Sequence, residues 1–438
     1  MDSSAKSPVQ TSKDFRVAII GGGMCGLACA VGLARAGIHA DLFEATAKFE
    51  EVGAGIGLGP NALQALNELG ILSSIMNLPE ASEHADRRMV FVSGLGDHQV
   101  LYDYGDSPDC GSLDGGISIY RPTFLDAVLP LIPDPSHMHF KKRLTSISTV
   151  SGTSAYTIHF SDGTTHEADL VIGADGIHSS SRTFLTGKDN KEVLDFTNTV
   201  AYRGVVPWDV LKGAGVRTDL TSRTFNFVGI GKHIIVYPIQ KRTKINIVAF
   251  ATETGVPVGS VQVAGSWVQR VPQQELVDAY AHWGPDVQTI LQHIEKPTKW
   301  FIHHLKPLER YSRDRVVLVG DAAHAMCPHL GSGFGQGLED VFLLCKLLGH
   351  PQTNLSNLQS ILAVYDCIRR PRAEMVWNRS FAAGLHYERC GLPGYQKNDM
   401  RSHFQGVWDP IWQHDLREDV SAALAELIKQ RIFTETSG

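Results

Sequence analysis

Three glycines near the start of the chain have the spacing of a phosphate-binding loop. Gly21, Gly23 and Gly26 form the pattern G-x-G-x-x-G directly after an apolar run, residues 16–20, and before a segment of helical composition. In such a loop the first glycine permits a tight turn, the second lets the backbone approach a pyrophosphate, and the third lets helix and strand pack closely. The unpaired N–H groups at the start of the helix then face the phosphates.

An acidic residue follows where the ribose of a dinucleotide would lie. Glu44 ends a second apolar run, residues 40–43, at about the 20-residue separation from the loop that dinucleotide-binding folds use. A carboxylate at this point accepts hydrogen bonds from ribose hydroxyls. Strand, helix, strand and acid in this order predict a βαβ unit that binds a dinucleotide. The alternative is a glycine-rich turn with a purely structural role.

The rest of the chain indicates the elements that must position these residues. Two more apolar runs, residues 168–174 and 315–320, each lead to a glycine and an aspartate, as buried strands of a parallel sheet do. Between them, residues 195–300 are rich in β-branched and aromatic side chains, which favours antiparallel strands with one covered face. Helical composition marks residues 274–293, 338–350, 358–368 and 421–431. The sequence predicts an α/β layer, interrupted by a mainly antiparallel sheet and closed by C-terminal helices.

Three further motifs carry a resemblance to a known family. Residues 169–182, which include Asp175, resemble the Asp-Gly fingerprint of flavoprotein monooxygenases of the para-hydroxybenzoate hydroxylase type. Residues 320–328 resemble the Gly-Asp motif of these enzymes, and Arg121 matches the arginine that they place near the flavin's pyrophosphate and ribityl chain. The sequence is therefore similar to the class A FAD-dependent aromatic monooxygenases, and most similar to salicylate hydroxylases and fungal dearomatising phenol hydroxylases.

The resemblance implies a Rossmann-type FAD-binding domain that holds FAD non-covalently. NADPH or NADH is expected to bind only transiently as co-substrate, since the sequence has no second glycine loop with its own acid. The residues implied to contact FAD are Gly21, Gly23, Gly26, Glu44, Arg121, Asp175, Asp321, Pro328, Gly331 and Gly333. Among them, Asp321 is expected to accept hydrogen bonds from the ribityl chain. Gly331 and Gly333, before a helix, are expected to present N–H groups to the pyrimidine end of the isoalloxazine. Asp175 and Arg182 have an alternative role, which is to hold the fingerprint loop together.

The motifs and the changes in composition divide the chain into four expected parts. They are a flexible N-terminal tail (residues 1–14), a discontinuous FAD-binding domain (15–80, 105–190 and 300–345), a substrate-binding domain (81–104 and 191–299) and a C-terminal helical region (346–438). The substrate-binding domain is expected to be mainly an antiparallel sheet, and the FAD-binding domain to surround it in the sequence.

Two residues of the expected substrate sheet and one residue near the flavin are candidates for catalysis. Arg203 and Tyr237 lie in segments that resemble those holding the phenolate oxygen in the fungal dearomatising hydroxylases. A guanidinium is always charged and favours the phenolate form. The alternative is that Arg203 pairs with a structural carboxylate and Tyr237 packs in the sheet. His329 is a candidate base or carboxylate partner, with packing or flavin contact as the alternative. His233 is a weaker candidate, and His324 is expected to support the Gly-Asp turn.

The resemblance implies hydroxylation of an electron-rich phenol with NAD(P)H and O2, through a flavin C4a-hydroperoxide. Two outcomes remain open. One is oxidative dearomatisation of a fungal polyketide-type phenol, which Tyr237 favours slightly. The other is the decarboxylating hydroxylation of salicylate hydroxylases, which residues 320–340 resemble at least as well. A flavin-dependent epoxidase on the same fold is a further alternative.

Composition excludes other classes of function. The chain has a net charge of −6, and its sequence indicates no basic face of the kind that binds nucleic acid. We therefore expect no nucleic-acid partner. No apolar run reaches the roughly 18–20 residues that cross a bilayer, and the first residues lack the apolar stretch of a secretion signal. The seven cysteines lack zinc-site spacing, so no metal is expected and Cys25 and Cys29 are interpreted as buried thiols. We expect a cytoplasmic enzyme with a small-molecule phenolic substrate; a homodimer is common in relatives.

Overall fold

The predicted βαβ unit opens a mostly parallel sheet. The computed structural model describes residues 13–49, 55–78, 86–106, 116–150, 155–390, 392 and 397–435. Within these residues the sheet has six strands, in spatial order β18 (Ser312–Arg313), β19 (Val316–Leu318), β11 (Leu170–Gly173), β1 (Val17–Ile20), β2 (Ala40–Phe43) and β7 (Met138–His139). β1 pairs in parallel with both β11 and β2, and all its residues are buried, as in a strand covered on both faces.

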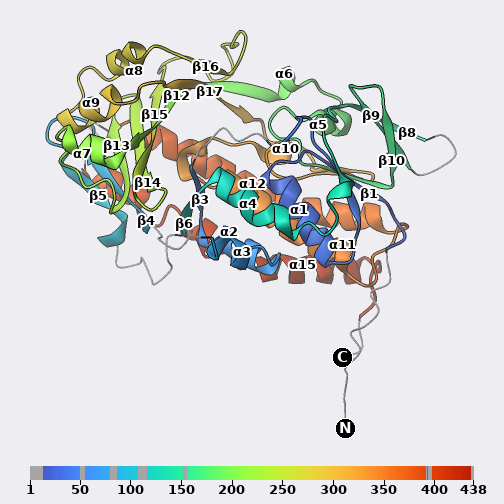
Figure 1. The fold of residues 1–438 in the computed structure, drawn as a ribbon. Coiled ribbons are helices and arrows are strands. Elements are labelled where there is room, and N and C mark those ends of the chain that lie inside the picture. Colours follow the sequence, from blue (N-terminus) through green and yellow to red (C-terminus); the bar gives the residue numbers. More distant parts are fainter. Residues whose placement is uncertain are drawn as a thin grey trace.

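Helices surround both halves of the molecule (Figure 1). They are α1 (Met24–Arg35), α2 (Pro60–Glu68), α3 (Leu72–Met76), α4 (Arg121–Val128), α5 (Ser180–Thr186), α6 (Asn190–Val193), α7 (Trp208–Gly213), α8 (Gln273–Ala279), α9 (Pro285–Gln292), α10 (Asp321–His324), α11 (Gly333–Gly349), α12 (Leu358–Tyr387), α13 (Lys397–Phe404), α14 (Asp409–Trp412) and α15 (Leu416–Lys429). Of these, α7, α8 and α9 lie beside a second large sheet, and α1, α4 and α11 lie near the parallel one. Among the described helices, none has both the length and the apolarity needed to cross a bilayer.

Four helix expectations need correction. The segment 274–293 is two helices, α8 and α9, because Pro285 starts a new helix at its first position, where proline's missing N–H costs nothing. α11 begins at Gly333 rather than Leu338. α12 runs on to Tyr387, past Pro371, so burial of one of its faces outweighs the local cost of an interior proline. The last expected helix, residues 421–431, belongs to α15, which begins earlier, at Leu416.

The second large sheet is mainly antiparallel, as predicted. In the described part of the chain its spatial order is β16 (Val268–Arg270), β17 (Thr298–Leu305), β12 (Leu194–Pro207), β15 (Lys244–Thr252), β14 (Lys232–Ile239), β13 (Arg223–Gly229), β4 (Asp86–Ser93) and β5 (Val100–Asp103). β13 and β4 pair in parallel. β17 continues this sheet to Leu305, somewhat beyond the expected boundary at residue 299.

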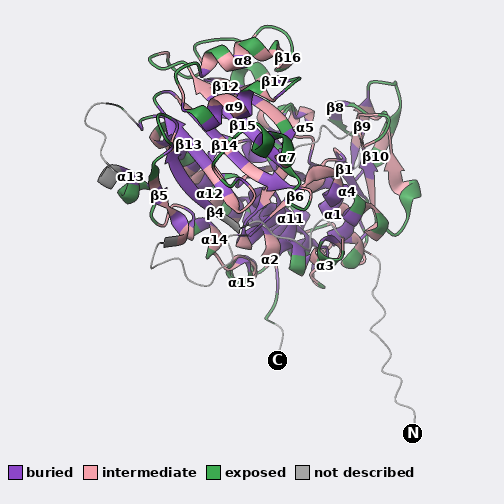
Figure 2. Ribbon diagram, turned by 60° about the vertical axis from the view of Figure 1, so that its left-hand side comes forward, coloured by how far each residue is buried: buried purple, intermediate pink, exposed green. Residues whose placement is uncertain are grey.

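One face of this sheet packs on α8 and α9, and the other faces the FAD-binding half. Phe227, Ile234 and Val236 share a buried cluster with residues of both helices. Figure 2 shows buried residues along β13 and β14, with exposed positions on α7 and α8 outside them. Two smaller sheets complete the fold: β3 (Gly55–Leu58) with β6 (Ile117–Tyr120), and β8 (Leu144–Thr149), β9 (Tyr156–Phe160) and β10 (Thr165–Ala168).

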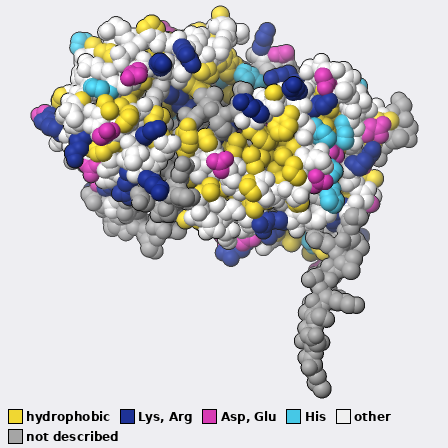
Figure 3. Space-filling model, viewed as in Figure 1, with side chains coloured by type: hydrophobic (Ala, Val, Ile, Leu, Met, Phe, Trp, Pro, Cys, Tyr) yellow, Lys and Arg dark blue, Asp and Glu magenta, His cyan; other side chains and the backbone are white. Residues whose placement is uncertain are grey.

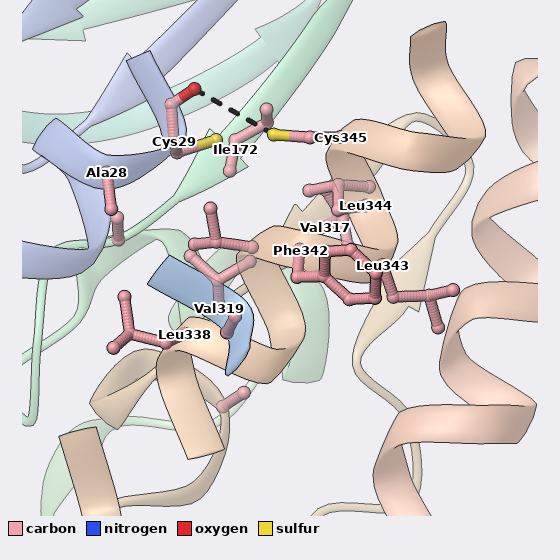
Figure 4. Packing of buried hydrophobic residues seen from close by; sticks show 14 of the residues in the cluster. Ala28, Cys29, Ile172, Val317, Val319, Leu338, Phe342, Leu343, Leu344 and Cys345 are labelled. Carbon is pink, nitrogen blue, oxygen red and sulfur yellow. Dashed lines mark hydrogen bonds between the residues drawn. The ribbon is translucent and has the colours of Figure 1, made fainter. Parts of the chain in front are cut away.

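α1 and α11 pack against each other next to β11. Figure 4 shows Cys29 of α1 and Cys345 of α11 in one apolar cluster, where the Cys345 thiol donates to the Cys29 carbonyl oxygen over 3.9 Å. A Cβ on Gly32 would lie 2.8 Å from the Cys345 sulfur, so the helices approach closely only because residue 32 is glycine. Among the described cysteines none forms a disulfide. The buried-thiol interpretation is confirmed for Cys29, while Cys25 is half-buried.

The edge strand β7 of the parallel sheet is covered by a polar cluster. Asp41 of β2 lies 2.8 Å from His139 and 3.1 Å from His137, and its second oxygen lies 3.6 Å from His166. Figure 3 shows histidine and acidic side chains together on this edge of the molecule. Because charged and hydrogen-bonded side chains cover a two-residue edge strand, the edge is protected from pairing with another chain.

Candidate active site

The glycine loop has the geometry that its spacing predicts. Gly21 has a φ of +104°, and a Cβ there would lie 2.4 Å from the Ala174 carbonyl oxygen. A Cβ on Gly26 would lie 1.9 Å from the carbonyl oxygen of Gly21, whereas a Cβ on Gly23 would meet no atom within 4 Å. α1 has no side-chain cap and no acidic residue in its first turn. The first and third glycines are thus required by the protein, while the second borders open space in front of uncapped N–H groups.

This contrast separates folding from cofactor binding. We expect Gly26→Ala to displace α1 and to lower the thermal unfolding midpoint. Gly23→Ala should leave the apoprotein at least as stable, since alanine adopts its φ of −68° and restricts the unfolded chain by roughly 0.4–1 kcal/mol. Its methyl group should still weaken FAD binding about tenfold or more by keeping the pyrophosphate away. Thermal unfolding of the apoproteins measures their stability, and FAD fluorescence titration measures their affinity for FAD. If Gly23→Ala binds FAD with native affinity, Gly23 does not face the pyrophosphate.

Glu44 is fixed at the end of β2, beside the glycine loop. Its Oε2 accepts from the N–H of Gly22 at 2.7 Å, and its Oε1 accepts from the N–H and hydroxyl of Thr46 at 2.8 and 2.9 Å. An ionised carboxylate has about four acceptor positions. The three bonds hold the side chain in place and leave room for a ribose hydroxyl.

Asp175 and Arg182 hold the fingerprint loop together, which is the structural role that the sequence offered as their alternative to contact with FAD. Asp175 accepts from the Ser179 hydroxyl at 2.5 Å and from the N–H groups of Ser180 and Ser181 at 2.8 and 3.0 Å. Arg182 is buried and donates to the carbonyl oxygen of Ala322 at 3.0 Å. The two residues hold the fingerprint loop against the Gly-Asp turn, and whether Asp175 also contacts FAD stays a prediction.

Asp321 lies in a recess at the end of the parallel sheet. Its side chain is accessible to solvent, yet the surrounding protein desolvates it and raises its pKa, against the opposing effects of His324, Arg121 and Arg182. A carboxyl that is both accessible and closely surrounded can be reached by a ligand that fills the recess. Arg121, the first residue of α4, is close enough to act electrostatically on Asp321 and on Arg203.

His324 supports the Gly-Asp turn through Asp340 of α11. Asp340 is buried, and one of its oxygens lies 2.6 Å from His324 Nε2 and accepts from the Gly320 N–H at 2.9 Å. Burial alone would raise the pKa of Asp340, but His324 and Arg369 hold it below its usual value. A buried carboxylate therefore fixes the backbone that carries Asp321, in the structural role expected for His324.

The second glycine-rich segment, residues 331–337, was expected to be a loop before a helix. In the structure most of it already belongs to the helix α11. Pro328 is the first residue of a 3-10 turn, η4 (Pro328–Leu330), and Gly331 ends this turn with a φ of +60°. Gly333 is already the first residue of α11, which has no side-chain cap and no acid in its first turn. A Cβ on Gly337 would lie 2.5 Å from the Cys25 sulfur, so that glycine serves packing. The uncapped start of α11 fits the pyrimidine end of a flavin.

Arg203 and Tyr237 lie on the inner face of the substrate sheet. The Arg203 guanidinium lies 4.9 Å from the ring centre of Trp300, and no carboxylate of the described residues pairs with it. Burial and Arg121 lower its pKa, and Tyr237 opposes this. A Cβ on Gly55 would lie 2.6 Å from the Tyr237 hydroxyl oxygen, so Tyr237 contacts the FAD-binding half. The structural alternative for Arg203, an ion pair with a carboxylate, is not found in the part of the chain described.

His329 and His233 meet at the boundary between the two halves. Their ring centres are 5.2 Å apart, and the His233 ring stacks on Phe250 at 4.5 Å. Burial and His233 together lower the pKa of His329 well below its usual value, so His329 is neutral. His233 Nδ1 lies 3.5 Å from a carboxylate oxygen of Glu388, which also accepts from the Thr252 hydroxyl at 2.7 Å.

Sequence reasoning rated His233 as a weaker candidate and did not consider Glu388. The signal for His233 was its separation of four residues from Tyr237, which puts both side chains on one face of a strand. Glu388 follows the end of α12, more than 150 positions from His233 in the sequence, and no local pattern links the two. The structure brings together Arg203, Tyr237, His233 and His329; their catalytic roles stay predictions.

Another buried histidine near the site gives the fold a sensitivity to acid. His304 of β17 packs on Trp377 at 4.7 Å, and burial lowers its pKa to about 4. An unfolded histidine titrates near pH 6.5, so the folded state binds this proton less readily and loses stability as the pH falls from about 6.5 toward 4.

From about pH 7.5 to pH 5, this group should lower the unfolding free energy by about 2 kcal/mol. We expect His304→Phe, which keeps the aromatic packing, to flatten the pH dependence of urea unfolding by that amount. The exposed His282 supplies the control, since His282→Phe should leave the slope unchanged. An unaltered slope in His304→Phe contradicts the pKa assignment.

A comparison with known proteins decides the family. The profile of a family described as FAD binding domain matches residues 14–380. The protein belongs to this family. Salicylate hydroxylase of Pseudomonas putida is 36% identical over 421 residues, which covers 94% of this chain and 95% of that one. The 6-methylsalicylate 1-monooxygenase of Aspergillus terreus is 32% identical, over 96% of this chain and 94% of that one.

The fold comparison agrees. A solved salicylate hydroxylase substrate complex superposes with a TM-score of 0.81 and 31% identity, covering 93% of this chain and 98% of that chain. The protein is an FAD-dependent aromatic hydroxylase, and a nicotinamide nucleotide is the reductant typical of its family. The sequence-based predictions of fold class, enzyme class and cofactor are confirmed.

Proposed function

We propose that this hydroxylase acts on an ortho-hydroxybenzoate and replaces its carboxylate by a hydroxyl. The observation that carries the proposal is the recessed cation Arg203, which has no carboxylate partner among the described residues and lies near Tyr237. Arg203 is half-buried; a cation that has lost part of its hydration without gaining a counterion is destabilised, and an anionic ligand compensates it. The two salicylate-type relatives, similar over nearly the whole chain, support a hydroxybenzoate as that anion.

The reaction balances as follows. The hydroxybenzoate anion, O2, NAD(P)H and two protons give a catechol, CO2, water and NAD(P)+. FAD, when bound, takes the hydride, activates O2 and supplies the oxygen atom. The protein must hold the ring in place, keep the phenol ionised and exclude water from the recess.

Arg203 and Tyr237 are proposed to hold the phenolate oxygen. The permanent charge of Arg203 lowers the phenol's pKa, and the Tyr237 hydroxyl donates a second hydrogen bond. Electron density from the phenolate then raises the nucleophilicity of the ring carbon that bears the carboxylate. The proposed phenolate site and the FAD-binding half meet at Tyr237 and Gly55.

His329 and His233 are proposed to face the carboxylate. Because His329 is neutral, it can donate an N–H to the carboxylate without the ion pair that would oppose loss of CO2. His233, whose Nδ1 lies 3.5 Å from a Glu388 carboxylate oxygen without a hydrogen bond to it, is proposed to accept the phenolic proton.

Dearomatising hydroxylation at an alkylated ring carbon is the second candidate. Pairing an arginine with a tyrosine resembles the phenolate site of fungal dearomatising enzymes, and the present chain has Arg203 and Tyr237 on one sheet face. The same phenolate would direct oxygen to a carbon bearing an alkyl group, and no carbon would be lost.

Product mass separates the two candidates. The purified holoenzyme is given NADH or NADPH with salicylate, 6-methylsalicylate or 2,4-dihydroxy-3-methylbenzaldehyde, and O2 consumption is recorded. We expect the benzoates to stimulate NAD(P)H oxidation and to give a product that has lost CO2 and gained one oxygen. A product from the aldehyde that gains oxygen and keeps every carbon, with no benzoate turnover, favours dearomatisation instead.

A further inference from the structure

The inner face of the substrate sheet carries a fully buried amide that the mechanism above does not use. Asn226 of β13 has no exposed surface, and within the described residues neither its Oδ1 nor its Nδ2 has a hydrogen-bond partner. Buried polar groups in folded proteins are nearly always paired, because an unpaired group has lost its bonds to water without replacement. A ligand is one way to supply the missing partner.

Asn226 faces the same side of the sheet as His233 and Tyr237. Side chains alternate along a strand, and the next residue, Phe227, packs into the opposite face with α8 and α9. The register places Asn226 opposite Ile235, midway between His233 and Tyr237 on β14. Diagonal neighbours on adjacent antiparallel strands lie about 7–8 Å apart. The three polar side chains therefore lie next to one another on one face of the sheet.

The neighbours of Asn226 in the sheet are apolar. Ile235 lies opposite it on β14, and Phe91 lies opposite it on β4. Phe91 in turn stacks on Phe404 of α13 at 4.3 Å, which fixes that side of the site. Neither flanking side chain can form a hydrogen bond with the amide.

We propose that Asn226 binds a second hydroxyl of the substrate ring, distinct from the oxygen assigned to Arg203 and Tyr237; this rests on the proposed function. An amide offers one acceptor and two donor hydrogens. A neutral hydroxyl both donates and accepts, so it satisfies both ends of the amide. A carboxylate only accepts and would bring its charge close to Oδ1, while an alkyl group satisfies neither end. The substrate class is then a dihydroxybenzoate rather than salicylate itself.

Ligand binding to the oxidised holoenzyme, followed through flavin absorbance, tests this without turnover. The probes are salicylate and the 2,3-, 2,4-, 2,5- and 2,6-dihydroxybenzoates. We expect at least one dihydroxybenzoate to bind about tenfold or more tightly than salicylate, because a site built for a hydroxyl rejects the analogue that lacks it. Asn226→Leu should reduce this ratio to near one. Ile235→Val changes packing on the same face without changing a hydrogen bond, and should keep the ratio.

The outcomes separate this role from the proposed function. Asn226→Leu replaces an unpaired amide by an apolar side chain of similar shape, so the apoprotein's unfolding midpoint should be unchanged or higher. If that variant does not fold, Asn226→Ser supports the same comparison. An unchanged ratio, or equal losses for all five ligands, overturns the role of Asn226 and points to a buried water. Failure of every benzoate to bind overturns the proposed function, and salicylate bound as tightly as all four dihydroxybenzoates overturns the role of Asn226 alone.

Discussion

Arg203→Ala should lower kcat/KM for the phenolic substrate by about 100- to 1,000-fold, the usual cost of removing one donor to a developing oxyanion. The guanidinium has no carboxylate partner among the described residues, so its charge is available to the substrate. Without it, the bound phenol keeps its proton and its ring carbon is a weaker nucleophile. The flavin should still be reduced, and much of the NAD(P)H consumed should appear as hydrogen peroxide.

The pH dependence gives a sharper readout than the loss of rate. The phenol of an ortho-hydroxybenzoate ionises well above the pH of about 10 at which a tyrosine side chain does, because its own carboxylate binds the proton and repels a second negative charge. Arg203→Ala should therefore gain activity with rising pH across the alkaline range. The wild-type enzyme should change little over this range, because Arg203 already keeps the substrate ionised. Arg203→Lys retains the charge and should recover part of the rate, although it lacks the planar fork.

Arg217→Ala is the matched control. Arg217 belongs to the same sheet domain, but its ion pair with Asp97 is largely exposed, with side-chain exposures of 67% and 93%. An exposed pair of this kind contributes little, so rate and coupling should stay native. Fully coupled turnover at the wild-type rate in Arg203→Ala removes Arg203 from the mechanism.

Local patterns in the sequence were sufficient to predict the cofactor-binding half. The loop from Gly21 to Gly26 depends on neighbours within a few positions, and its strand, helix and acid follow in order. The contacts of Glu44 are local, with Gly22 in the loop and with Thr46 two residues further along the chain. Such features are predictable because the physics that fixes them is local.

The substrate half was less predictable because its site depends on distant contacts. His233 gains its neighbours from η4 and from Glu388, which the sequence separates widely. The unpaired state of Asn226 follows from a register across β4, β13 and β14, and a polar residue in a strand gives no sign of it. The continuation of α12 through Pro371 was also unpredictable from local sequence. Burial against α11 and α15 outweighs the low propensity of proline for the interior of a helix.

Arg369→Leu should destabilise the protein by about 3–5 kcal/mol, the usual cost of removing one partner from a buried ion pair. Arg369 of α12 is fully buried and donates to Asp340 at 2.9 Å and to Glu339 at 2.8 Å. Asp340 in turn accepts from the Gly320 N–H. The loss should therefore loosen the turn that carries Asp321, and FAD affinity should fall together with stability.

The pH dependence of this effect has a definite sign. Burial would raise the pKa values of Glu339 and Asp340, but Arg369 contributes to holding both below their usual values. A carboxylate with a lowered pKa stabilises the fold above its unfolded pKa, about 4, and this contribution is lost as the pH falls. The wild-type protein and Arg369→Leu should therefore differ most near neutral pH and converge in acid, where the unpaired carboxylates of the variant take up protons.

The neighbouring residue supplies the control. Arg370 pairs with Asp366 on the same helix at 3.0 Å, the same type of bond, but its side chain is 33% exposed. Arg370→Leu should cost at most about 1 kcal/mol and leave FAD binding unchanged. Urea unfolding and FAD titration of both variants measure the contrast. Equal losses in the two would mean that burial does not set the strength of these ion pairs, and the link from α12 to the Gly-Asp turn would then lose its physical basis.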